Sequence, residues 1–195
     1  MNSDTIDVIT GEMTELYLAV FQYEELFHKG TARVDLMNDV DGRVFGELQM
    51  ILRDSIILLI TRLFDRQEVC GKETSTFERA ITELDLQGKD VGGLKQELKR
   101  LKDQYEPLIQ QRHKRIAHND KAVIEGNASI GRPSITDIKA ARDDVKDFAS
   151  KLHERGKGEP IYLEEPTFLI PLGLGYERFF KVLKAGLDAV NVESK

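Results

Sequence analysis

Apolar residues recur at helical spacing along almost the whole 195-residue chain. A period near 3.6 residues predicts amphipathic helices rather than strands. Ser3 is suited to cap a first helix that runs to about His28 and stops at Gly30. A shorter helical or turn segment is expected over 31–40, and a long helix from about 41 to 65.

The second half of that long helix is apolar nearly all round, with the sequence MILRDSIILLITRLFDR at 50–66. A helix without a polar face has to be covered on every side. We therefore expect this segment either at the centre of a helical bundle or in a subunit interface.

Helix-start signals define the middle of the chain. Ser75 with Glu78 three residues later forms a capping-box pattern, which predicts a short helix ending near Gly88. A further helix is expected over 94–118, after Gly92 and Gly93, and Pro107 should kink or restart it because proline lacks a backbone N–H.

The C-terminal part begins with a second capping box, Ser134 with Asp137, which predicts a helix that stops at Gly156. A proline-bounded segment over 160–171 is expected to be extended, and a last helix to cover about 175–190.

Together these elements predict an all-α helical bundle with a long central helix pair and a minor extended segment. No repeat or linker interrupts the pattern, so one domain is expected over 1–195. Within it, residues 156–195 would form an extended strap followed by the final helix.

Composition restricts the setting of this bundle. The single Cys70 cannot form a disulfide framework, which favours a reducing, cytoplasmic compartment. The longest apolar run, at 56–60, is too short to span a bilayer, so no membrane partner is expected. The net charge of −6 argues against coating long nucleic acid, and any nucleic-acid contact should be a small basic patch.

The common cofactor and metal motifs are missing from the sequence. It contains no glycine-rich phosphate loop, nucleophile elbow or His-Glu-x-x-His pattern. Glu25 and His28 have the spacing used in di-iron bundles, but a second such pair is lacking, so a surface helix terminus is the better interpretation. His113 and His118 lie about 140° apart on a helix and cannot chelate one ion from one face. We therefore expect neither metal nor cofactor.

Arg112 is a charged residue on the apolar side of its predicted helix. It falls near the middle of an apolar stripe formed by Leu94, Leu98, Leu101, Tyr105, Leu108 and Ile109. A guanidinium on a buried stripe is costly unless it is paired. Two alternatives follow: a structural ion pair with Asp54 or Asp65, or a cleft or dimer interface where the arginine binds an anion.

Arginine together with histidine suits metal-independent cleavage of RNA. A histidine titrates near neutral pH and can take the proton of a ribose 2′-hydroxyl. A guanidinium can hold the phosphate with two hydrogen bonds and stabilise its growing charge. Two copies of such a site, facing each other across a two-fold axis, would supply both an acid and a base.

The stretch RHKRIAH at 112–118 resembles the R-x(4–6)-H motif of the HEPN superfamily, in which a polar residue follows the arginine. The longer string KRIAHND at 114–120 and the upstream ITRLFDR at 60–66 are similar to the AbiU-type branch associated with abortive infection. The resemblance extends from the first long helix to about residue 155.

This resemblance implies a homodimeric helical bundle that cleaves RNA without metal, as a toxin or antiviral effector. Arg112 would bind the scissile phosphate, His118 would be the acid or base, and His113 would orient the arginine or contact substrate. The implied partners are RNA and a cognate antitoxin, of the nucleotidyltransferase type or another.

The neighbouring polar residues have lesser expected roles. Lys114, Arg115 and Asn119 match no fixed catalytic position and are expected at most to contact phosphate. Arg62 and Asp65 are interpreted as a structural pair at i,i+3 that also supports the motif. The alternative function is a non-catalytic helical dimerisation module of HEPN fold, in which the motif is kept as an interface ion cluster.

Overall fold

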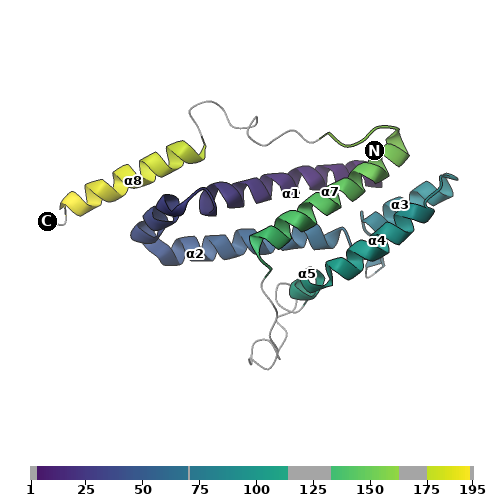
Figure 1. Ribbon diagram of the computed structural model, residues 1–195, viewed down its shortest axis with the longest axis horizontal. Helices are drawn as coiled ribbons and strands as arrows, with labels where there is room; N and C mark the ends of the chain where they lie inside the picture. The colour runs from purple at the N-terminus through teal and green to yellow at the C-terminus, as the bar shows by residue number, and fades with distance from the viewer. Residues whose placement is uncertain (1–3, 70, 114–132, 163–174, 194–195) are drawn as a thin grey trace, which may run out of the picture. The chain divides into compact units, whose positions relative to one another are not determined.

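The computed structural model describes residues 4–69, 71–113, 133–162 and 175–193. In this part of the chain the elements, shown in Figure 1, are α1 (Thr5–Phe27), α2 (Thr31–Arg62), β1 (Glu68–Val69), β2 (Lys72–Glu73), α3 (Phe77–Leu86), α4 (Gly92–Gln104), α5 (Glu106–Gln111), α7 (Ile135–Lys157) and α8 (Tyr176–Glu193). The two strands form a minimal antiparallel hairpin. The predicted all-α bundle is confirmed.

The contacts of the chain cluster into two compact units. The first comprises 1–16 and 54–163, and the second comprises 17–53 and 164–195. The organisation of 1–195 as one domain stays a prediction.

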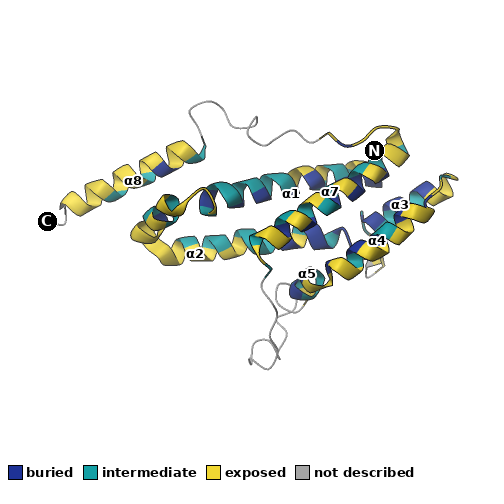
Figure 2. Cartoon of the chain, viewed as in Figure 1, coloured by how far each residue is buried: buried dark blue, intermediate teal, exposed yellow. Residues whose placement is uncertain are grey.

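The first unit contains most of the apolar core. Helices α3, α4 and α7 pack against one another, each with its buried face inward (Figure 2). The largest fully buried side chains of this unit are Ile9, Met13, Leu16, Ile56, Ile57, Ile60, Leu63, Phe77, Leu84, Leu101 and Phe148. The end of α2 therefore lies in the core of this unit through Ile56, Ile57 and Ile60, whereas Leu58 between them is 37% exposed. The expected burial of this segment on every side holds only in part.

The second unit has a smaller core. Leu26, Met37 and Phe180 are buried there, and partly buried apolar side chains pack around them. The guanidinium of Arg33 lies 4.8 Å from the centre of the Phe180 ring, which ties α2 to α8 through a cation–π contact.

The first two helices start and stop close to the predicted positions. Ser3 lies outside the described residues, and Asp4 caps α1 by accepting the N–H of Ile6 at 3.1 Å. Gly30 follows α1 with φ of +118°, the conformation expected of a stop. Inside α2 the backbone breaks at Asp41 (φ −168°, ψ 92°), whose carboxylate accepts the N–H of Arg43 and thereby restarts the helix.

The predicted cap of α3 is wrong by one residue. Thr76, not Ser75, accepts the N–H of Arg79, and Glu78 instead accepts the N–H of Gln67. Because Leu63 accepts the N–H of Phe77, the chain is anchored to the end of α2 just before the helix begins. This anchor fixes Phe77 as the first helical residue and Thr76 as its cap.

The capping box that begins α7 is confirmed, since Ser134 and Asp137 bond reciprocally. The predicted stop at Gly156 is wrong. The helix continues to Lys157, and Gly158, with φ of +89°, ends it. Gly156 serves packing instead, because a Cβ at this position would collide with Cδ1 of Ile6.

The predicted extended segment at 160–171 is described only over 160–162, where the chain has no helix or strand. The rest of that segment lies outside the described residues. The final helix, expected over about 175–190, is confirmed as α8.

Candidate functional site

Arg112 is positioned by the short helix α5. Helix α4 ends at Gln104, and α5 begins again at Glu106, with Pro107 in its first turn. Proline is tolerated there because the first N–H groups of a helix have no partner within the helix. The expected restart is thus confirmed, and it sets the phase of the two residues that end the helix, Gln111 and Arg112.

Asp65 is positioned by the turn that follows α2. Leu63 and Phe64 in that turn are buried, and the Phe64 ring lies 5.7 Å from Phe77 and 6.5 Å from Tyr105. Because the two residues before it are held in the core, Asp65 has a defined place at the edge of the unit.

Arg112 and Asp65 form an ion pair. Nη1 of Arg112 donates to Oδ1 of Asp65 at 2.6 Å, and the two side chains are 19% and 24% exposed. Of the two partners considered from the sequence, Asp65 is the one found. The pair joins the end of α5 to the end of α2 across 47 positions of sequence.

The predicted pairing of Arg62 with Asp65 is wrong. Arg62 donates through Nε to Glu12 at 2.7 Å and contacts Glu15 at 3.3 Å. The i,i+3 relation requires both residues on one helix, and α2 ends at Arg62. Burial raises the pKa of Glu12 above its usual range, and the charge of Arg62 opposes that rise.

Gln111 is a buried polar residue that the sequence did not single out. It is 1% exposed, and neither of its amide atoms has a hydrogen-bond partner among the described residues. A buried amide without a partner is costly, so this position is unusual. Gln111 follows Leu108 of the apolar stripe by three residues. This helical spacing is the sequence feature that indicates a buried position.

Of the site residues predicted over 113–119, only His113 belongs to the described part of the chain. Arg112 follows the last residue of α5, and its N–H donates to the carbonyls of Leu108 and Ile109. His113 is exposed. Lys114, Arg115, His118 and Asn119 lie outside the described residues.

The base of α5 is fixed to α7 by a polar cluster. The Tyr105 hydroxyl donates to Asp144 at 2.6 Å, and Gln104 donates to the same carboxylate at 3.0 Å. Burial, followed by this hydrogen bond, raises the pKa of Tyr105 well above its usual range. A cavity of about 450 Å³ lies beside the cluster, lined by Pro107 and Leu108 on one side and Asp137 on the other.

No group of three or more His, Cys, Asp and Glu side chains suited to a metal occurs in the described part of the chain. Glu25, which shares its sequence spacing with His28, contacts Lys29 and Arg33 at 3.1 Å in each case. It therefore belongs to an ion cluster near the end of α1.

The end of α5 presents a partly buried guanidinium and a buried amide in consecutive residues. Arginine can donate two parallel hydrogen bonds to a phosphate, whereas Asp65 receives one from Nη1 in this structure. The ion pair thus holds the guanidinium in place without using all its donors. This arrangement fits binding of an anion such as a phosphodiester.

Comparison with known proteins identifies the family. The model of the family HEPN_AbiU2, described as AbiU2, matches residues 7–157 and so includes Arg112, Asp65 and Gln111. No curated protein and no solved structure matches the chain. None of the helices in the described ranges is long and apolar enough to cross a membrane. This chain belongs to the HEPN AbiU2 family.

Proposed function

We propose that this chain is a metal-independent endoribonuclease of a defence or toxin–antitoxin system, acting in the cytoplasm. The observation that carries the proposal is the half-buried guanidinium of Arg112, held at 2.6 Å by Asp65 at the start of an R-x5-H sequence. Family membership supports the same conclusion.

In the proposed reaction the ribose 2′-oxygen attacks the adjacent phosphorus, and the bond from phosphorus to the 5′-oxygen breaks. The products are a 2′,3′-cyclic phosphate and a 5′-hydroxyl. One His118 takes the 2′-hydroxyl proton as base, and a second gives a proton to the leaving oxygen as acid. Arg112 binds the phosphate and stabilises its charge, while His113 orients that arginine or contacts the substrate.

A homodimer would supply the second His118. Support comes from α2, where Val44, Met50 and Ile51 in the second unit are 55%, 47% and 58% exposed. Val44 and Ile51 are seven residues apart and share one face of the helix. Exposed apolar side chains on one face are typical of an interaction surface. A cognate antitoxin is a further proposed partner.

The second candidate function is a non-catalytic interaction module. The observation that favours it is the same ion pair, because Asp65 already satisfies part of the guanidinium and gives Arg112 a structural role. The exposed apolar face of α2 would then be the functional surface.

Cleavage of labelled RNA in the presence of EDTA separates the two functions. Wild type is expected to cut and to leave 2′,3′-cyclic phosphate ends. Arg112→Ala and His118→Ala are each expected to lower the rate by about 100-fold or more. The matched controls are Arg43→Ala and His28→Ala, which replace exposed residues and should cut like wild type.

Intact RNA with wild type, or equal cutting by the Arg112 and His118 variants, would refute the enzymatic proposal and favour the interaction module. Thermal unfolding of each variant shows whether a loss of rate reflects loss of folded protein.

A further inference from the structure

A groove between α3 and α4 lies outside the Arg112 site. Its volume is about 420 Å³. Its apolar floor includes Ile81 of α3 and Leu98 of α4, which are 3% and 7% exposed. The α4 side of the groove is lined by Lys95, Lys99 and Lys102.

These three lysines form a regular stripe. At positions i, i+4 and i+7 they fall within a sector of about 60° on one side of α4. Along the helix axis Lys99 and Lys102 follow Lys95 by about 6 Å and 10.5 Å. A row of ammonium groups at this spacing fits consecutive phosphates of one strand better than it fits a compact anion.

Two of the three lysines have no ion-pair partner among the described residues. Lys95 pairs with Asp85 at 2.6 Å, whereas Lys99 and Lys102 make no ion pair with any described residue. Two carboxylates, Glu78 and Asp103, also line the groove, and Glu78 already accepts the N–H of Gln67 at 3.3 Å. The lining thus holds both signs of charge, and the positive charge available to a ligand is that of Lys99 and Lys102 along α4.

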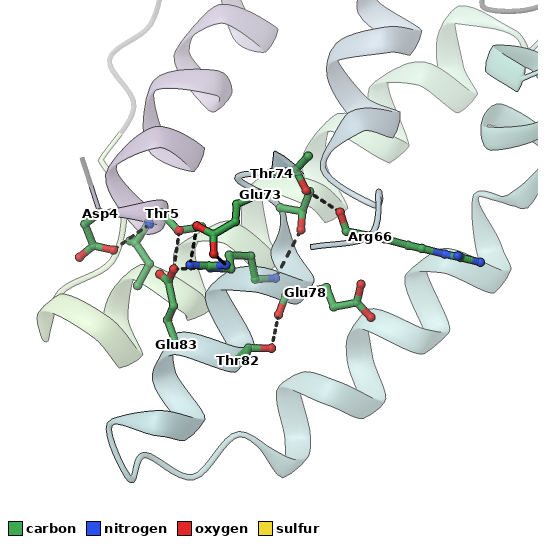
Figure 3. A network of polar contacts seen from close by, with 11 residues as sticks. Asp4, Thr5, Arg66, Glu73, Thr74, Glu78, Thr82 and Glu83 are labelled. Carbon is green, nitrogen blue, oxygen red and sulfur yellow. Dashed lines mark hydrogen bonds and ion pairs between the residues drawn. The ribbon is translucent and has the colours of Figure 1, made fainter. Parts of the chain in front are cut away.

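Arg66 adds a further cation at the same end of the unit. Figure 3 draws its side chain extended away from the polar network around Glu73 and Thr74. Its guanidinium makes no hydrogen bond or ion pair with the described residues, and only its backbone carbonyl is engaged, by Thr74.

The groove begins close to the Arg112 site. Gln67 lines it and follows Asp65, the partner of Arg112, by two residues. Two residues of extended chain span at most about 7 Å. A strand whose phosphate reaches Arg112 is therefore close enough to continue along the lysine stripe.

We propose that this groove binds the backbone of single-stranded RNA, through Lys99 and Lys102, as the strand runs to or from the Arg112 site. The proposal rests on the proposed function and adds the surface that binds the substrate beside the scissile phosphate. Recognition is by phosphate charge, so the groove confers affinity without sequence preference.

The test uses a fluorescein-labelled 2′-O-methyl RNA oligonucleotide, which lacks the attacking hydroxyl and stays intact while binding is measured. The double variant Lys99→Gln, Lys102→Gln is expected to bind at least about fivefold more weakly at low salt. Losing two phosphate contacts should also reduce the slope of log affinity against log salt by about 1.4. The control Arg178→Gln, Lys181→Gln removes two exposed charges from α8 and should bind like wild type.

Cleavage of ordinary RNA by the same proteins distinguishes the two proposals. If the lysine variant binds and cuts like wild type, the groove proposal is overturned and the proposed function stands. If wild type binds RNA in a lysine-dependent manner but never cuts, the groove is upheld and the endoribonuclease proposal fails. Equal weakening in the α8 control would overturn the groove proposal, because binding would then follow net charge alone.

Discussion

At the scale of single residues, Arg112 has one anionic partner among the described residues, Asp65, and a phosphate as partner in the proposed reaction. Asp65 holds Nη1 at 2.6 Å, and the remaining guanidinium donors suit a phosphate. Both side chains are less than a quarter exposed, so solvent screens their attraction only partly. The pair should therefore contribute measurably to stability as well as orient the arginine.

A double-mutant cycle on Arg112→Ala and Asp65→Ala measures this contribution. We expect a coupling free energy of about 1–2 kcal/mol, because removing either partner leaves the other partly buried and unpaired. Urea unfolding of the four proteins gives the value. The control cycle on Arg43 and Glu47, an exposed i,i+4 pair, should give at most about 0.5 kcal/mol. Additive effects of Arg112 and Asp65 would contradict the prediction.

Sequence reasoning about single residues was correct where the position of a residue around its own helix decided the outcome. Helical phase placed Arg112 near the middle of an apolar stripe, and the cost of burying its charge led to Asp54 and Asp65 as the two possible partners. The same reasoning failed for Arg62, whose partners Glu12 and Glu15 come from α1, far away in the sequence. The buried position of Gln111 was not predicted, because glutamine is common on exposed helix faces. Its burial depends on where α5 begins again after α4.

At the scale of elements, helix starts were set by anchors as well as by capping residues. Ser134 and Asp137 cap α7 as the pattern predicts, because nothing competes with a local box. Before α3 the predicted cap Ser75 is followed directly by Thr76, another residue type that caps helices. The hydrogen bond from Phe77 to Leu63 selects Thr76.

Alanine substitutions test this assignment. Thr76→Ala is expected to lower the free energy of unfolding by about 1 kcal/mol, because the N–H of Arg79 loses its acceptor. Ser75→Ala should change it by no more than about 0.5 kcal/mol. Chemical denaturation measures both values. A larger loss for Ser75→Ala than for Thr76→Ala would show that the cap is Ser75.

At the scale of the whole molecule, the proposed composite site requires a second copy of the chain. The apolar side chains exposed on α2 in the second unit are the surface that we propose for that copy. Burying a branched aliphatic side chain contributes about 1.5–3 kcal/mol, so a charge at Ile51 should strongly weaken an interface that covers it.

Light scattering tests the assembly. Wild type at micromolar concentration is expected to have twice the mass of the 22.2 kDa chain, and Ile51→Glu is expected to return it to a single chain. Leu86→Glu, at an 84% exposed position at the end of α3, is the control and should leave the dimer intact. A monomeric wild type would rule out the composite site.

The sequence by itself determined the helices, several of their ends and the resemblance to the HEPN AbiU2 family, which the family match confirms. The helical period of apolar residues and the effects of proline and glycine on helix ends act over a few neighbouring residues. They can therefore be recognised from the sequence alone. The tertiary structure decided which charges meet. The pairing of Arg112 with Asp65 and the cap at Thr76 depend on contacts between segments separated in the sequence. The lysine groove depends on how the consecutive helices α3 and α4 pack against each other.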